Sequence, residues 1–427
     1  MSYFFRVTSF VQLFRLAILS FLFFTVIGFS LSAQDRCRSF EYQQQEINNN
    51  PTLQHRLQAV ENFLNTNNHS ESLRTESSVF GPAAIIKIPI IVHVIYNKSS
   101  ENVSDAQIKA QIAALNRDFR KKNADTSKIP SFFKQFAADC QIEFVLASSD
   151  PKGRATNGII HKYSPVTSWG MDDKIKFSSE MGNDAWDANS YLNIWVGNIK
   201  NLLGYSSVVG GAPEKDGIVL NPSSLGTAEA GGRTAVHEVG HWLGLRHLWG
   251  DADCGDDMVD DTPKQRAYTV GCPTAIRLTC GNNTTGDMYN NYMDFTSDAC
   301  LNMFTLGQKA RMRKLFDAGG IRNVLLSSKG LNISTIEQIA LPERTPTWLK
   351  VKSFPNPATN TVSVNLEYDA RWIGKEMVIM NMMGTVVLKQ IITNTIQKID
   401  ISQLNPGVYF IKAEKEGEKM LEKMVKM

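Results

Sequence analysis

The sequence predicts an α+β domain followed by a small C-terminal β-sandwich. Three observations predict this architecture. An apolar, β-branched run at Ile85–Ile95 is typical of a buried strand. An amphipathic helix pattern with a plausible cap starts at Ser104. After Val351 apolar and polar residues begin to alternate, which indicates the strands of a sandwich.

Helical patterns occur at four places before this C-terminal region. After Ser104, the residues Ile108, Ile112 and Leu115 recur at the spacing of one helix face. Short strands and turns are expected from there to Leu220, and loops are expected after the third helix. The expected helices are Leu53–Leu64, one that starts at Ser104, one that begins near Gly232, and Gln308–Phe316.

Three of the seven histidines lie in the run HEVGHWLGLRH. On a helix, residues four apart share a face, so His237 and His241 can aim two imidazoles at one point. Gly244 can leave the helical path, which brings His247 round as a third ligand. Three neutral imidazoles leave the fourth position of one Zn²⁺ for water, as in catalytic zinc sites. Glu238 can reach that water as a general base.

The alternative for this run is an ordinary amphipathic helix with polar residues on its outer face. The complete pattern, with its glycine and third histidine, favours the metal site. Either way, the helix needs packing residues, which we expect to be Ala235, Val236, Val239, Leu243 and Trp242.

The pattern H-E-x-x-H-x-x-G-x-x-H resembles the metzincin clan of zinc peptidases. That clan has a methionine-bearing turn beneath the metal, and NNYMD places Met293 in that role. With DDMVDDTP, NYMDF, four cysteines and FTLGQKARM, the chain looks like the pappalysin and cytophagalysin family, peptidase family M43. The likeness spans about residues 85 to 315. It implies a metzincin-type zincin catalytic domain.

Six cysteines suit an exported protein. Four of them lie around the loops after the motif, and spacing alone leaves three pairings open. A second zinc site is the rival interpretation, which the lack of any C-x-x-C pair disfavours. The resemblance implies the disulfides Cys254–Cys280 and Cys272–Cys300. Cys37 and Cys140 remain, either paired with each other or free.

Four carboxylates, Asp256, Asp257, Asp260 and Asp261, crowd one loop ahead of Thr262. Clustered carboxylates in a secreted loop suit Ca²⁺, and solvated loop charges are the alternative. The resemblance includes structural calcium, so we expect Asp257, Asp260, Asp261 and Thr262 to bind it.

Two residues that follow Met293, Asp298 and Phe295, bear on substrate specificity and on catalysis. In the family, an acid at Asp298 lines the pocket for the side chain just after the scissile bond. A carboxylate there would favour Arg or Lys, and a surface loop residue is the alternative. Relatives often carry a tyrosine where this chain has Phe295, so zinc and backbone groups would carry more of the intermediate's charge. The hydroxyl of Tyr292 is not expected to reach.

The N-terminal 33 residues predict a secretory signal, with Arg6, an apolar stretch at Leu16–Phe29 and a small Ala33 before Gln34. A transmembrane anchor is the alternative, but this stretch is short for a span of about 20 residues. Residues 34–79 are polar, with little material for a core, and predict a propeptide. No later segment is apolar enough to cross a bilayer.

Cys37 gives the propeptide a means of latency. A thiolate there could occupy the fourth zinc position, favoured by its two arginine neighbours. The resemblance adds that some metzincins keep zymogens silent with a propeptide cysteine. A disulfide with Cys140, or no role, is the alternative. We expect the mature start between Leu73 and Phe80, with Arg74 attractive for self-cleavage.

In the tail, apolar residues alternate with polar ones at Val362, Val364 and Leu366, and again at Val378 and Met380. FPNPATNTVSV, MMGTVV, LNPGVYFIKAE and the Lys-rich end resemble the sorting domain of the type IX secretion system of Bacteroidota. A substrate-binding accessory module is the alternative. The expected domains are a signal peptide (1–33), a propeptide (34–79), a catalytic domain (80–326), a linker (327–349) and a sorting domain (350–427).

A formal charge of +3 on 427 residues, without a basic aromatic stripe, argues against a nucleic-acid partner. We therefore predict a zinc metalloendopeptidase, secreted or on the cell surface and exported through the periplasm. Its partners would be protein or peptide substrates and the type IX machinery. The alternatives are a surface- or carbohydrate-binding protein with a decayed peptidase domain, and a zinc amidase acting on non-peptide substrates.

Overall fold

The computed structural model describes residues 35–66, 84–226, 231–332, 352–366, 372–415 and 418–427. The expected signal peptide, the expected mature start with Arg74 and most of the expected linker lie outside these residues. Among the residues described, no helix combines the length and apolar character that a membrane span needs.

A mixed sheet forms the centre of the main domain, and β2 (Ile86–Tyr96) is its longest strand. On one side β2 pairs in parallel with β3 (Ile142–Leu146) along its first half and β4 (Ile159–Tyr163) along its second. On the other side it pairs in parallel with β5 (Leu192–Val196). A strand covered on both faces is a continuous apolar run, which is why the sequence predicted this one within a residue at each end.

Beyond β5 the sheet includes a strand of opposite direction. β7 (Ile218–Leu220) continues in parallel beside β5, and β6 (Leu202–Ser206) runs antiparallel beside β7. The short strand β1 (Asp35–Cys37), from the N-terminal segment, lies next to β6 at this end of the sheet.

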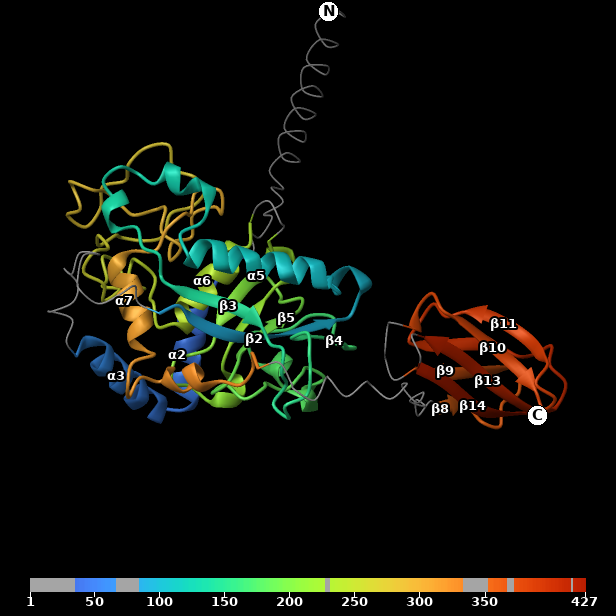
Figure 1. Ribbon diagram of the computed structural model, residues 1–427. Coiled ribbons are helices and arrows are strands. Elements are labelled where there is room, and N and C mark those ends of the chain that lie inside the picture. Colours follow the sequence, from blue (N-terminus) through green and yellow to red (C-terminus); the bar gives the residue numbers. More distant parts are fainter. Residues whose placement is uncertain (1–34, 67–83, 227–230, 333–351, 367–371, 416–417) are drawn as a thin grey trace, which may run out of the picture. The chain divides into compact units, whose positions relative to one another are not determined.

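Two helices pack on the sheet and on each other, as Figure 1 shows. The first, α5 (Asp105–Phe119), begins at Ser104, whose hydroxyl accepts the backbone N–H of Gln107 at 3.2 Å. It lies on β3 and buries the predicted apolar face. The second, α6 (Arg233–Trp242), contacts β6, β7 and α5. Both predicted helix starts are confirmed.

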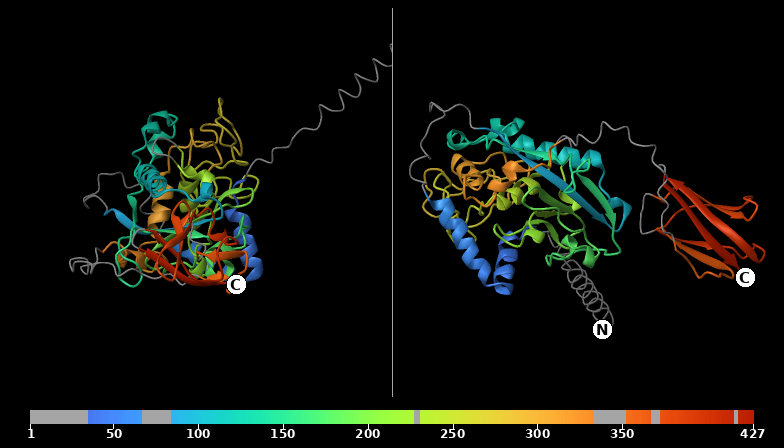
Figure 2. Two further views of the ribbon diagram at one scale, coloured as in Figure 1. Left: turned by 90° about the vertical axis from the view of Figure 1, so that its right-hand side faces the viewer. Right: turned by 60° about the horizontal axis from the view of Figure 1, so that its bottom comes forward.

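The N-terminal segment, residues 36–66, contains two helices, of which the sequence predicted one. The predicted helix is α3 (Thr52–Asn65), and the other is α2 (Ser39–Asn49). Figures 1 and 2 show both in blue beside the main domain. Tyr42 of α2 and Leu53 of α3 are buried in a cluster with side chains of that domain. The segment therefore gains its core from the domain on which it packs.

Residues 243–305 form loops without a helix or strand. The disulfides Cys254–Cys280 and Cys272–Cys300 connect these loops in the pairing that the resemblance implied. The four cysteines therefore do not form a second zinc site. The chain becomes helical again at α7 (Leu306–Lys314), which starts two residues before the predicted position because Thr305 caps it.

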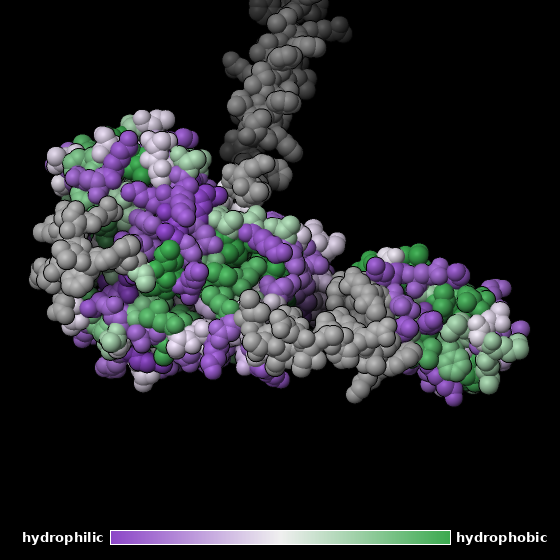
Figure 3. All heavy atoms as spheres, viewed as in Figure 1, coloured by the Kyte–Doolittle hydropathy of each residue, from purple (hydrophilic) through white to green (hydrophobic). Residues whose placement is uncertain are grey.

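The C-terminal domain is an antiparallel β-sandwich, as predicted. Four-stranded and three-stranded sheets, in the orders β11-β10-β13-β14 and β12-β9-β8, enclose one apolar core. Within β10 the predicted facing is wrong, because Met377 and Ile379 point into the core and not Val378 and Met380. Figure 3 shows that hydrophobic residues also reach the surface of this domain. The strands are β8 (Lys352–Phe354), β9 (Thr361–Asn365), β10 (Glu376–Asn381), β11 (Val386–Ile391), β12 (Ile396–Asp400), β13 (Gly407–Lys415) and β14 (Glu418–Lys426).

Candidate active site

Helix α6 carries the first two histidines of the motif. Its other faces are buried in the core, which fixes the positions of the two imidazoles. The predicted packing residues are all fully buried, including Trp242, whose indole donates to the Asp216 carboxylate at 3.1 Å. The helix ends at Trp242, and Gly244 follows with a φ of +81°, a backbone conformation that favours glycine. This change of direction returns the chain toward the helix and brings His247 beside His241.

The three imidazoles converge through their Nε2 atoms. Nε2 of His241 lies 3.1 Å from Nε2 of His237 and 3.1 Å from Nε2 of His247. Bonds of about 2.0–2.1 Å to one tetrahedral zinc ion would separate such nitrogens by about 3.3 Å. Burial lowers the pKa of His237 well below its usual value and that of His241 to about 3, which favours the neutral form that binds zinc. The residues therefore fit the metal.

Each histidine is oriented through its second nitrogen. Nδ1 of His237 lies 2.7 Å from the carbonyl of Tyr292, and Nδ1 of His241 lies 2.9 Å from the carbonyl of Leu245. Nδ1 of His247 contacts the carboxylate of Asp251. A proton on each Nδ1 leaves the lone pair of Nε2 for zinc. Sequence analysis missed Asp251, although its position four residues after His247 was a usable signal.

Glu238 lies beside this cluster and is fully buried. Its Oε2 accepts the Ser39 hydroxyl at 2.9 Å and lies 3.4 Å from Sγ of Cys37, while Oε1 has no partner among the described residues. Burial raises the pKa of Glu238 to about 8, although the hydrogen bonds from Cys37 and Ser39 and the charge of Arg36 oppose the rise. A carboxylate in this place can exchange a proton with a group at the fourth zinc position.

Met293 packs directly against α6. A Cβ built on Gly240 would lie 2.5 Å from Sδ of Met293, so the sulfur fills the space beneath the helix between the two histidines. The carbonyl of Tyr292 orients His237, but its ring packs on Phe304 in the core at a centroid distance of 4.8 Å. The ring of Phe295 lies 5.0 Å from that of His247, which places an apolar face beside the metal ligands.

The N-terminal segment reaches the histidine cluster through Cys37. Sγ of Cys37 and one ring nitrogen from each of the three histidines all lie within 4.8 Å of one another. Cys37 and Cys140 are both free and buried, so they do not pair. The expectation that its arginine neighbours favour the thiolate stays a prediction, because bound zinc would itself act on this sulfur. Burial, followed by the Glu238 carboxylate, raises the pKa of Cys37, and Arg36 points elsewhere.

The side chain of Arg36 pairs with Asp298, the predicted specificity residue. One guanidinium nitrogen contacts the Asp298 carboxylate, and the other donates to the carbonyl of Thr296 at 2.5 Å. The second carboxylate oxygen of Asp298 accepts the backbone N–H of Arg233 at 2.9 Å, at the start of α6. Asp298 is therefore held beside the active-site helix with one oxygen available to a cation.

The acidic loop divides into two groups. Both carboxylate oxygens of Asp257 lie within 2.9 Å of the Thr262 hydroxyl, which is 2.7 Å from the carbonyl of Val259. Among the described hydrogen bonds, none joins Asp260 or Asp261 to these oxygens, and the expected four-residue calcium site stays a prediction. Asp260 is exposed. Asp261 instead accepts hydrogen bonds from Thr305 and Gly307 at the start of α7.

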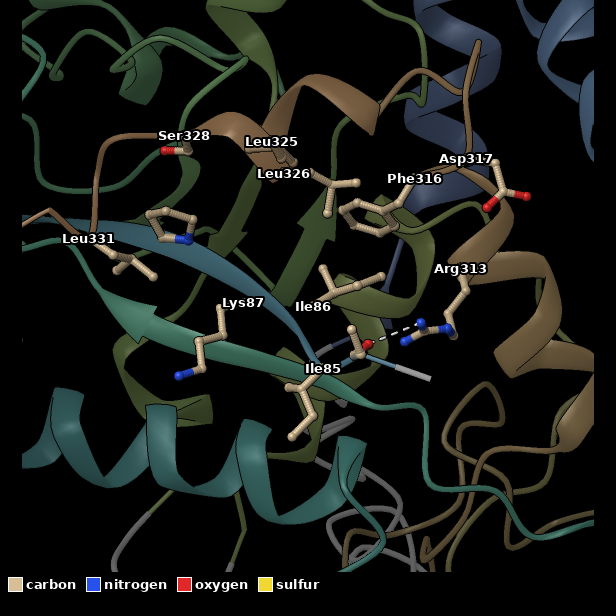
Figure 4. A pocket seen from close by; sticks show the side chains of 12 residues that line it. Ile85, Ile86, Lys87, Arg313, Phe316, Asp317, Leu325, Leu326, Ser328 and Leu331 are labelled. Carbon is tan, nitrogen blue, oxygen red and sulfur yellow. Dashed lines mark hydrogen bonds between the residues drawn. The ribbon is translucent and has the colours of Figure 1, made fainter. Parts of the chain in front are cut away.

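A separate cavity of about 460 Å³ lies between the start of β2, the end of α7 and the short helix η8 (Asn323–Ser327) (Figure 4). Its wall is largely apolar, and Arg313 donates to the carbonyl of Ala84 at its rim. None of the zinc histidines lines it, and the group of metal-binding side chains found among the described residues lies elsewhere. The histidine cluster is therefore the candidate active site.

Comparison with known proteins agrees with this geometry. The family described as "Pregnancy-associated plasma protein-A" matches residues 176–317, and the "Secretion system C-terminal sorting domain" matches residues 352–427. An extracellular metalloprotease of Pyricularia oryzae is 32% identical over 249 residues, which are 54% of this chain and 75% of that protein. One of Verticillium alfalfae is 30% identical over 258 residues, 56% of this chain and 79% of that protein.

Two solved structures are similar in fold and sequence. Mature mirolysin of Tannerella forsythia, in complex with a cleaved peptide, is 46% identical, covers 57% of this chain and 97% of its own, and has a TM-score of 0.56. A mutant of promirolysin from the same organism is 42% identical, with coverages of 68% and 97% and a TM-score of 0.61. By sequence, fold and the converging histidines, the chain belongs to the pappalysin (M43) family of metzincin peptidases and is a secreted zinc metalloendopeptidase with a type IX sorting domain.

Proposed function

We propose that Glu238 is the general base of this peptidase and that Asp298 selects Arg or Lys after the scissile bond. The observation that carries the proposal is the position of the Glu238 carboxylate, 3.4 Å from the Cys37 sulfur, which lies within 4.8 Å of one nitrogen of each zinc histidine. Zinc held by His237, His241 and His247 would polarise the scissile carbonyl and acidify the attacking water. Glu238 would take a proton from that water and deliver one to the leaving amine.

The ring of Phe295 offers no hydroxyl to the developing oxyanion, so other groups must stabilise that charge. A decayed peptidase domain would have lost ligands, and here all three histidines converge. Cleavage of casein by the purified mature protein, abolished by a zinc chelator and restored by added Zn²⁺, would distinguish a peptidase from an amidase of non-peptide substrates.

Replacing Asp298 should remove the preference for basic residues. In wild type we expect cuts before Arg or Lys, because the Asp298 carboxylate already binds one guanidinium, that of Arg36. Loss of a charged hydrogen bond costs about 1.5–3 kcal/mol, so Asp298→Ala should lower kcat/KM for these peptides by about 10- to 100-fold. Cleavage profiling on a peptide library measures this.

The matched control is Asp298→Asn, which removes the charge but keeps an oxygen for the N–H of Arg233. It should lose the preference while the melting temperature stays close to wild type. A wild-type profile dominated by apolar residues after the cut would rule out this role for Asp298.

We propose further that residues 34–79 are a propeptide between a signal peptide (1–33) and the catalytic domain (80–326), followed by a linker (327–349). The position of Cys37 among the three zinc histidines supports latency through a sulfur at the metal. With this sulfur in place, no position is left for the catalytic water.

The Cys37→Ala zymogen should therefore be active at once, or process itself faster than wild type, because water can enter the vacated position. The measurement is a time course of peptide cleavage and of chain length after purification. Cys140→Ala is the matched control, since Cys140 is equally buried but lies in the main core. An unchanged lag for Cys37→Ala would end the proposal, and so would a Cys37–Cys140 disulfide found by mass spectrometry in the wild-type zymogen.

We propose structural calcium for Asp257, Asp260, Asp261 and Thr262. The proposal rests on Asp257 and Thr262, where carboxylate, hydroxyl and carbonyl oxygens gather. Burial raises the pKa of Asp257 to about 7, so a cation at this place would relieve an uncompensated buried charge. Added Ca²⁺ should raise the melting temperature of wild type and should have little effect on Asp257→Asn. Equal responses in the two proteins would contradict the site.

A further inference from the structure

The N-terminal segment is fastened at a second place, away from the zinc. Helix α2 is mostly polar, and only Ser39 and Tyr42 are buried on it. The Tyr42 side chain enters a slot of the main domain and is 1% exposed. Its ring lies 5.2 Å from that of Tyr205, on strand β6. The ammonium of Lys176 lies 5.4 Å from the centre of the Tyr42 ring, close enough for a cation–π contact.

At the end of this slot the Tyr42 hydroxyl donates to the carboxylate of Asp173 at 2.7 Å. Asp173 also accepts from Lys176 at 2.8 Å and from Tyr205 at 3.3 Å, and both Asp173 and Lys176 are almost wholly buried. Burial raises the pKa of Asp173, but the Lys176 ammonium and the Tyr42 hydroxyl outweigh it and hold the pKa low. The phenol therefore meets a fixed, charged acceptor.

One helical turn later, Glu46 lies on the same face of α2. Its carboxylate pairs with Lys215 at 2.9 Å, and Lys215 also reaches Asp173 at 3.2 Å. Lys215 ends the short helix η6 (Pro213–Lys215), at the rim of the slot. A tyrosine and an acid four residues apart thus match an acceptor and a cation on the main domain.

The polar and aromatic partners described for Tyr42 and Glu46 are none of the zinc histidines, and all of them belong to the main domain. Excision of the N-terminal segment would leave Asp173, Lys176, Tyr205 and Lys215 in place, with an aromatic-walled opening above a carboxylate. The ligand that this opening fits is the Tyr42–Glu46 face of α2, which occupies it in the structure.

We propose that this slot is a docking site for the Tyr42–Glu46 face of α2 that persists in the mature enzyme, where it binds the excised segment in trans as an inhibitor. The inference rests on the proposed function in one respect, which is that the segment is removed on maturation. The ligand of the slot is therefore a helix that carries a tyrosine and, one turn later, an acidic residue.

The test uses the mature enzyme purified after processing and a synthetic peptide of residues 34–66. Each inhibition constant is measured against the uninhibited rate of the same enzyme variant. The wild-type peptide should inhibit. Tyr42→Phe, which removes only the hydroxyl, should weaken inhibition by about tenfold, since the lost hydrogen bond is to a charged group. Glu46→Lys in the peptide, or Lys215→Glu in the enzyme, should weaken it at least as much.

The charge-reversed pair decides the matter, because Glu46→Lys peptide with Lys215→Glu enzyme should recover most of the lost inhibition. A double reversal no better than either single change, or equal inhibition by the Tyr42→Phe and wild-type peptides, would overturn the docking site. Repeating the series with Cys37→Ser peptides separates docking from the zinc contact. A Cys37→Ala zymogen that is active at once, together with a peptide that never inhibits, would refute the docking site and leave the cysteine proposal standing.

Discussion

The Glu238→Ala enzyme should bind zinc as wild type does and lose almost all proteolysis. The three ligands remain, oriented by the carbonyls of Tyr292 and Leu245 and by Asp251. The carboxylate that we propose as proton acceptor is gone. Removal of a general acid–base lowers kcat by about 10²- to 10⁴-fold. Metal content by mass spectrometry and kcat on a quenched peptide give the two readouts.

Two variants make this result specific. Glu238→Gln keeps the shape of the side chain and should be as inactive as Glu238→Ala, which separates proton transfer from packing in a fully buried position. His241→Ala should lose both activity and zinc, because two of three imidazoles bind the metal far more weakly. Near-normal proteolysis by Glu238→Ala would disprove the mechanism.

Deletion of residues 351–427 should leave an active peptidase that stays in the periplasm of its native host. The match to the sorting domain spans residues 352–427, and this domain has a core of its own, separate from that of the catalytic domain. Each unit can therefore fold without the other. Immunoblots and casein cleavage on fractionated cells measure where the enzyme resides.

The matched control places residues 333–427 behind an unrelated periplasmic reporter, which should then leave the cell. Melting of the truncated enzyme at the wild-type temperature would exclude misfolding as the reason for retention. Normal extracellular activity after the deletion would remove the sorting role from this domain.

Local patterns were sufficient for the main elements of the fold. The β2 run, the Ser104 cap and the start of α6 near Gly232 were all predicted, because burial on both faces, capping and helical spacing leave marks within a few residues. The sequence of helix α2 contains no such local pattern. Its sequence is polar, and Tyr42 is buried by the surface of the main domain and not by its own neighbours. The facing of β10 was missed because consecutive residues from Met377 to Met380 are all apolar, so alternation could not select a side.

The sequence by itself determined the chemistry of the metal site. His237, Glu238, His241 and His247 lie within one helix and the turn that follows, so their spacing carries their geometry. Tertiary structure decided which other residues contact this motif. Asp251 contacts His247, and Met293 packs against Gly240. Arg36 pairs with Asp298, and Cys37 lies among the three imidazoles. In the acidic loop, tertiary structure decided that Asp257 hydrogen-bonds with Thr262 and that Asp261 hydrogen-bonds with the start of α7. Except for Asp251 and the acidic loop, these contacts join residues tens to hundreds of positions apart. Their partners are chosen by the packing of whole elements, which no short pattern in the chain records.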